Sequence, residues 1–171
     1  MVNRVANFEV NLCSVNDEGK IAYGRVWRFM IDSTDQTHRF ARLLASSGAT
    51  HNENLLWVML HGARGIASLL RSFMAPVPLP DTYSRYRFSR ASCFPTVLDL
   101  ALVAHMSAKV PVLPTGCKGG IDHIARSLGV TTHLCDVVTV VRCYMSLRDG
   151  GELERYVSSG LMERCCPKCT T

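Results

Sequence analysis

The stretch "ERCCPKC" at residues 163–169 has the residue types of a metal site. Cys166 and Cys169 are two residues apart, and two thiolates at this spacing in a tight turn can share one metal ion. A structural zinc site needs two further ligands. The nearest candidates are Cys165, Cys143, Cys135 and His133. We predict zinc held by Cys166, Cys169, Cys143 and His133; a cluster of reduced, partly exposed thiols is the alternative, since the chain lacks a second Cys-x-x-Cys.

A second stretch, "YSRYRFSR" at residues 83–90, combines three aromatic side chains with three arginines. Arginine binds phosphate and aromatic rings stack on unpaired bases, so this mixture is typical of a surface that grips RNA or single strands. We predict a strand here. The residues expected to bind nucleic acid are Tyr83 for stacking and Arg85, Arg87 and Arg90 for phosphate. The alternative is an edge strand whose arginines are merely solvated.

Residues 121–141, "IDHIARSLGVTTHLCDVVTVV", resemble the helix-turn-helix of DNA-binding regulators. Ala125 stands where that motif has a small residue between its helices, and Gly129 stands at the turn. The resemblance implies a recognition helix over residues 131–142 that reads duplex DNA. Cys135 departs from the Val or Ile usual at its position, and the one Asp and one Arg of this helix cancel in charge. A purely structural helical corner is therefore the alternative.

Cys117, in "PTGCKGGIDH", is the best candidate for a nucleophile. It precedes an expected helix and is followed by Lys118, and both a helix N-terminus and a cation lower the pKa of a thiol. The surrounding residues match no known catalytic signature. A cysteine-dependent enzyme is therefore an alternative and not the main hypothesis.

The elements that must position these residues begin with two β-prone stretches. "NFEVNLCSV" alternates in polarity and "KIAYGRVWRFMI" follows a turn ending at Gly19, which predicts an N-terminal β-hairpin. The expected helices include one with a capping box at Ser33, one over residues 53–74, one from Pro95 and three short ones over residues 120–164. The predicted fold class is α+β and mainly helical, a hairpin followed by about five to six helices.

Length and composition indicate one folded domain. The chain has 171 residues, of which 47% are hydrophobic, so it can build a real core. We predict a single domain over residues 1–171, with an alternative break at the proline-rich residues 75–80 and a cysteine-rich segment at 131–171. The sequence shows no targeting segment and no apolar run long enough to span a bilayer. These observations predict an intracellular protein, cytoplasmic or nuclear, with no membrane partner and with reduced thiols.

The net charge of +5 permits an acidic partner. We therefore predict a non-enzymatic accessory or regulatory protein, of a kind found in viruses, that binds nucleic acid, with RNA or single strands favoured over duplex DNA. Its C-terminal segment would be stabilised by zinc. One alternative is a protein-interaction or assembly subunit that forms homo-oligomers through residues 53–74 and the hairpin edge. The other is the enzyme that uses Cys117.

Overall fold

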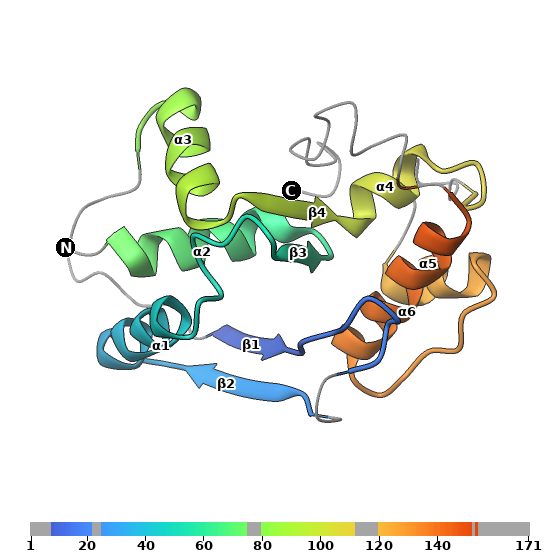
Figure 1. Ribbon diagram of the computed structural model, residues 1–171, viewed down its shortest axis with the longest axis horizontal. Helices are drawn as coiled ribbons and strands as arrows, with labels where there is room; N and C mark the ends of the chain where they lie inside the picture. The colour runs from blue at the N-terminus through green and yellow to red at the C-terminus, as the bar shows by residue number, and fades with distance from the viewer. Residues whose placement is uncertain (1–7, 22–24, 75–79, 112–119, 152, 154–171) are drawn as a thin grey trace. The chain divides into compact units, whose positions relative to one another are not determined.

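The computed structural model describes residues 8–21, 25–74, 80–111, 120–151 and 153. Their elements, in chain order, are β1 (Phe8–Leu12), β2 (Trp27–Ile31), α1 (Thr34–Ser46), β3 (Leu56–Met59), α2 (Gly62–Met74), α3 (Tyr83–Cys93), β4 (Thr96–Asp99), α4 (Leu100–Met106), α5 (Ile121–Ser127) and α6 (Asp136–Asp149) (Figure 1). The described residues form both strands and helices, and more of them are helical than in strands. This confirms the predicted α+β, mainly helical class.

The chain divides into two compact units. Unit 1 comprises residues 1–12, 27–57 and 63–96, and unit 2 comprises residues 13–26, 58–62 and 97–171. The single domain over residues 1–171 stays a prediction, and most of the expected break at residues 75–80 lies outside the described residues. Among the described helices, none is both long and apolar enough to cross a membrane.

The N-terminal hairpin of unit 1 is confirmed. Strands β1 and β2 pair in antiparallel fashion, with Val10 opposite Phe29 and Leu12 opposite Trp27. The alternation of β1 turns its apolar residues to one face, as period-two patterning requires. The ring of Phe29 packs on Phe40 of α1 at a centroid distance of 4.8 Å, so the hairpin and α1 share apolar contacts.

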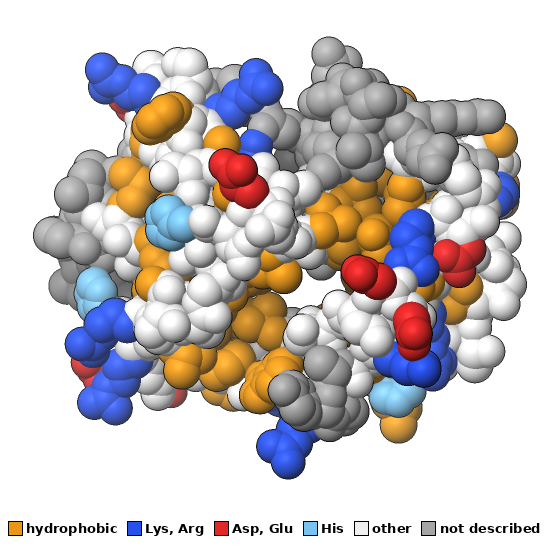
Figure 2. Space-filling view, viewed as in Figure 1, with side chains coloured by type: hydrophobic (Ala, Val, Ile, Leu, Met, Phe, Trp, Pro, Cys, Tyr) orange, Lys and Arg blue, Asp and Glu red, His pale blue; other side chains and the backbone are white. Residues whose placement is uncertain are grey.

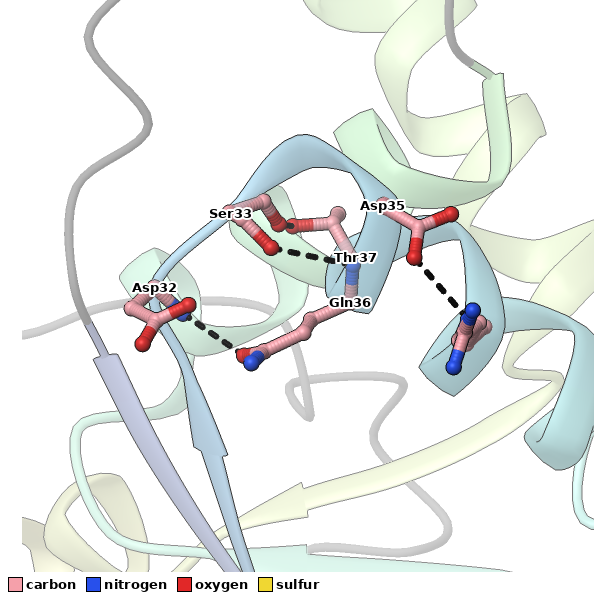
Figure 3. A network of polar contacts seen from close by, with 6 residues as sticks. Asp32, Ser33, Asp35, Gln36 and Thr37 are labelled. Atoms are coloured by element: carbon pink, nitrogen blue, oxygen red, sulfur yellow. Dashed lines mark hydrogen bonds and ion pairs between the residues drawn. The ribbon is translucent and has the colours of Figure 1, made fainter.

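Helix α1 begins where its capping residues predict. The Ser33 hydroxyl accepts a hydrogen bond from the Gln36 backbone N–H at 3.3 Å, and the Gln36 side-chain oxygen accepts one from the Asp32 N–H at 3.0 Å (Figure 3). These two bonds occupy backbone donors that a helix N-terminus leaves free. The helix ends before Gly48, whose φ of +71° suits glycine.

The helix predicted over residues 53–74 is wrong in its first part. Residues Leu56–Met59 form strand β3, and α2 begins only at Gly62. A short run of consecutive apolar residues, here "LLWVML", is compatible with either a buried strand or a buried helix, and periodicity alone does not distinguish them. From Gly62 onward the prediction holds, because Ile66, Leu69 and Leu70 lie in the core.

The strand predicted over residues 83–90 is also wrong, because these residues form helix α3. Arginine is a good helix former, and the Tyr86 N–H donates to the Thr82 carbonyl at the first turn. The helix ends at Phe94, which is fully buried and packs edge-on against Trp57 at 5.1 Å and Phe73 at 5.9 Å. This aromatic cluster forms part of the core of unit 1.

Strands β3 and β4 form a second two-stranded sheet. The helix expected from Pro95 is wrong over its first turn, since Thr96–Asp99 form β4 and α4 follows at Leu100. Figure 1 draws the arrows of β3 and β4 in the same direction, and α2 and α3 supply the crossover that a parallel pair needs. The carboxyl ends of the two strands therefore meet at one edge.

Unit 2 has its core between α4, α5 and α6. The residues of these helices that are fully buried are Leu100, Ala104, Ile124, Ala125, Cys143 and Leu147. Helices α5 and α6 contact each other, and Gly129 between them has a φ of +67°. The Val130 N–H donates to the Ala125 carbonyl at 2.8 Å and closes the end of α5. The helical corner is therefore present, although its second helix begins at Asp136 and not at residue 131.

Candidate functional site

The carboxyl ends of β3 and β4 meet at Asp99. One oxygen of its carboxylate accepts the His61 N–H and the Ala101 N–H, and the other accepts the Gly62 N–H, each at 3.0 Å. Asp99 thus caps α4 and also holds the first residues of α2. In sheets of parallel strands, ligands bind outside the carboxyl ends of the strands. This edge, which we call the sheet-end site, is therefore the first candidate for a functional site.

His61 is the exposed member of the sheet-end site. Its φ of +51° is unusual for a residue that is not glycine and costs about 1–3 kcal/mol of strain. The two bonds from Asp99 to residues 61 and 62 hold the backbone in this conformation. An imidazole nitrogen can donate a hydrogen bond or accept one, according to its tautomer. The site thus presents one versatile side chain on a fixed backbone.

Helix α3 carries the residues that were expected to bind nucleic acid. Arg85 is exposed and lies 4.0 Å from Asp81, while Arg87 is exposed and Arg90 donates to the Phe94 carbonyl at 3.1 Å. The side chain of Tyr83 lies outside the described part of the structure. Phe88 is 77% exposed and lies one turn from Arg85. In Figure 2 basic side chains flank hydrophobic surface over α3.

The helical corner at residues 121–141 uses several polar side chains internally. Thr139 is buried, and its hydroxyl oxygen accepts the His133 N–H at 2.9 Å. Arg142 donates to the Thr131 carbonyl at 3.0 Å, and the Nδ1 atom of His133 accepts the Cys135 N–H at 3.0 Å. These bonds stabilise the corner itself. Its similarity to a helix-turn-helix, with the DNA reading that this implies, stays a prediction.

Only two of the four predicted zinc ligands, Cys143 and His133, lie in the described residues. Cys143 is fully buried on α6, and burial raises the pKa of its thiol to about 11, so it remains protonated at neutral pH. His133 lies on the exposed loop before α6. Cys166 and Cys169 lie outside the described residues, as does Cys117.

Sequence reasoning missed Asp99 and His61 as partners. Asp99 precedes the apolar helix "LALVAHM", and an Asp at that position is a typical helix N-cap. The His61–Gly62 pair interrupts an apolar run, which is a typical end of a strand. Both local signals were readable, but the contact between them joins residues 38 apart in sequence and belongs to the tertiary structure.

The chain matches no protein-family model, and no curated protein matches its sequence. Among solved structures it is similar to Pop2p of S. pombe in its Mg²⁺- and Mn²⁺-bound form. The TM-score is 0.65 at 18% identity, over 82% of this chain and 67% of the Pop2p chain. This likeness establishes the fold.

The likeness to Pop2p corrects two expectations about function. The expectation of a non-enzymatic nucleic-acid-binding accessory protein is contradicted, because the chain shares its fold with Pop2p, a protein that binds Mg²⁺ and Mn²⁺. Such ions serve phosphoryl chemistry in polymerases and nucleases. The zinc expectation is contradicted as well, since Pop2p binds Mg²⁺ and Mn²⁺ and the described residues of this chain contain no group of three potential metal ligands.

The ions of Pop2p raise the question of whether this chain has ligands for them. Within the described ranges, no group of three His, Cys, Asp or Glu side chains could hold a metal ion. The Asp99 carboxylate offers about four acceptor sites, and three backbone N–H groups already use it. The described residues therefore do not fit a resident divalent ion.

Proposed function

We propose that this chain is a nuclease that acts on RNA. The observation that carries the proposal is the fold that it shares with Pop2p over 82% of its length. Cleavage of phosphodiester bonds is one of the reactions that Mg²⁺ and Mn²⁺, the ions bound by that neighbour, support in proteins. The net charge of +5 suits a polyanionic substrate. An RNA substrate also implies the cytoplasm or the nucleus.

The surface that would bind the RNA is helix α3. Arg85, Arg87 and Arg90 give the helix three positive charges, and the helix contains no acidic residue. Phe88 adds an exposed ring next to Arg85, which suits stacking on an unpaired base. We retain Tyr83 in the proposed surface on its sequence position alone.

The sheet-end site is the proposed place of the chemistry. It lies at the carboxyl ends of two parallel strands, where this kind of sheet binds its ligands. His61 is exposed there on a backbone fixed by Asp99, which allows it to bind a phosphate oxygen or to move a proton.

A cleavage assay tests the function. End-labelled single-stranded RNA is incubated with the purified chain in Mg²⁺, in Mn²⁺ or in chelator, and the products are separated on a gel. We expect shortened RNA in at least one condition, and the chelator arm shows whether an ion supplied with the RNA is needed. RNA that stays intact in every condition would contradict the proposal.

His51 offers a matched control for the site. His51 and His61 are both exposed and both have a left-handed backbone, with φ of 57° and 51°. His51 belongs to unit 1, where its N–H donates to the Cys93 carbonyl, whereas His61 belongs to unit 2. We expect His61→Ala to slow cleavage and His51→Ala to leave it unchanged. Equal activity in the two variants would show that the reaction does not depend on the sheet-end site.

A further inference from the structure

Strand β2 of unit 1 has an edge to which no other described strand is paired. It pairs with β1 on its other side, and the described part of the chain adds no third strand to this sheet (Figure 1). Such an edge offers a row of backbone N–H and C=O groups to a second chain. Proteins usually blunt an edge with Lys, Pro or a bulge. The strand "WRFMI" has no Lys or Pro, and its pairing with β1 contains no bulge.

The side chains of β2 alternate between the two faces of the hairpin. The odd-numbered residues point to the face on which α1 packs, since the Phe29 ring contacts Phe40. Arg28 and Met30 therefore point to the opposite face, and Asp32, directly after the strand, follows the same alternation. Met30 is 60% exposed, and Arg28 and Asp32 are exposed as well. An exposed apolar side chain thus stands between two opposite charges along this edge.

The two charged residues can each bind a further partner. Arg28 donates to the Glu9 carboxylate of β1 at 2.7 Å through one nitrogen, and a guanidinium has five N–H donors. The Asp32 carboxylate has no hydrogen bond or ion pair with any other described residue. The edge therefore carries a cation with unused donors and, four residues later, an anion without a partner among the described residues.

The charge pattern of β2 is complementary to itself in one register. When a strand pairs in antiparallel fashion with its own copy, a two-fold axis passes through the central pair. A register centred on a residue places backbone groups that point away from β1 opposite one another. Centred on Arg28, the pairing opposes two like charges, and centred on Phe29 it places Arg28 opposite Met30. Centred on Met30, it places Arg28 opposite Asp32 of the second copy on both sides of the axis.

We propose that the free edge of β2 is a docking site for β2 of a second copy of this chain. The two hairpins form one four-stranded antiparallel sheet in the order β1, β2, β2 and β1. The two Met30 side chains meet at the axis and cover each other, and an Arg28–Asp32 ion pair between the copies lies at each end of the interface. Because the axis is perpendicular to the sheet, α1 of both copies lies on the same face.

Sedimentation of the full chain over a concentration series, under reducing conditions, measures the dimer. Asp32→Arg tests the ion pairs, because each Arg28 then faces an arginine of the second copy. We expect the dissociation constant of the dimer to rise by about tenfold in this variant. Glu53→Arg is the matched control, since it makes the same charge change at an exposed position outside β2, and it should leave the constant unchanged. A chain that stays monomeric throughout would overturn the proposal, as would equal weakening by the two variants.

A cysteine at position 30 tests the register. Opposite residues of antiparallel strands have Cα atoms about 4.5–5.5 Å apart, a separation that a disulfide can bridge. Met30→Cys is oxidised with oxidised glutathione, its remaining thiols are alkylated under denaturing conditions, and it is digested with trypsin. Residues 29–39 then form one peptide without a native cysteine, and we expect this peptide linked to a second copy of itself.

Ser46→Cys supplies the control for the cross-link. Ser46 is exposed on α1, and its tryptic peptide, residues 43–64, also lacks a native cysteine. We expect no self-linked peptide from this variant, because position 46 lies outside the proposed interface. The absence of a self-linked 29–39 peptide in Met30→Cys would overturn the register, and so would an equal yield of cross-link from the two variants.

Discussion

The carboxylate of Asp99 accepts hydrogen bonds from the backbone N–H groups of both His61 and Gly62, at 3.0 Å each. The side chain that ends β4 thereby fixes the residues that follow β3. Its third bond, to the Ala101 N–H, caps α4. One carboxylate therefore sets the backbone of the sheet-end site and the start of two helices.

The first prediction concerns the stability that Asp99 provides. Asp99→Ala removes three charge-assisted bonds to backbone donors, and we expect it to lower the free energy of unfolding by about 2–4 kcal/mol. Urea denaturation measures the change. Asp35→Ala is the control, because the Asp35–Arg39 ion pair is exposed and should contribute at most about 0.5 kcal/mol. Equal losses in the two variants would show that the Asp99 bonds add little.

The second prediction concerns the strained backbone at His61. Glycine adopts a φ of +51° without the penalty that other residues carry, but it loses more entropy on folding. We expect His61→Gly to leave the free energy of unfolding unchanged or to raise it by up to about 1 kcal/mol. We expect His61→Val to lower it by about 1–2 kcal/mol, because a β-branched residue tolerates this region poorly. A more stable valine variant in thermal melts would contradict the assigned conformation.

The third prediction concerns RNA binding by α3. Phe88→Ala should weaken binding of single-stranded RNA by about 1–3 kcal/mol at constant salt, because a stacked base loses its platform. Arg85→Ala should weaken binding and reduce its dependence on salt, since one phosphate contact is lost. Fluorescence anisotropy across a salt series measures both effects. Arg39→Ala is the control, since Arg39 is also exposed and paired with an Asp four residues away, but lies on α1.

The fourth prediction tests the packing on α6 of the small hairpin over residues 13–21, which the antiparallel bridge between Val15 and Ile21 closes. Gly19 and Gly48 have similar left-handed backbones, with φ of 78° and 71°, so alanine strains both. Only at Gly19 would the added Cβ meet a neighbour, the Met145 side chain, whereas Gly48 has open space around it. We expect each variant to lose about 1 kcal/mol from backbone strain and Gly19→Ala to lose more. Identical melting temperatures for the two variants would contradict the hairpin contact.

The fifth prediction concerns Cys143 at alkaline pH. Its folded-state pKa of about 11 is above the ordinary value of 9.0, because burial disfavours the thiolate. The resulting stabilisation is fully present below pH 9 and is lost as the pH rises toward about 11. We expect Cys143→Ala to cost about 1 kcal/mol at neutral pH and to reduce the fall in stability between these two values. Parallel curves of unfolding free energy against pH for the two proteins would contradict the raised pKa of Cys143.

Local signals made part of the fold predictable. The hairpin followed from alternation in β1 and the turn at Gly19, and the start of α1 followed from the capping box at Ser33. The corner between α5 and α6 followed from Ala125 and Gly129. Each of these features depends on residues close together in sequence, whose own conformational preferences agree with the final structure.

The remaining features depend on contacts that a single stretch of sequence does not reveal. The apolar run at residues 55–60 suits a helix or a strand, and only its pairing with β4 selects the strand. The side chains of residues 83–90 alternate as in a strand, yet these residues form helix α3. The helix is followed directly by Phe94, whose ring is buried. For the candidate site, Asp99 and His61 carry signals of a cap and a strand end, and only the folded chain joins them.

The hydrogen bond between Asp17 and Arg148 also bears on how the protein folds during synthesis. The two residues are 131 positions apart, and ribosomes add about 5–20 residues per second. Asp17 is therefore made about 7–26 s before Arg148 of α6. During that interval Met145 is absent, so Gly19 lacks the contact that it makes in the folded protein. Unit 2 can thus be completed only after the residues between Asp17 and Arg148 have been made.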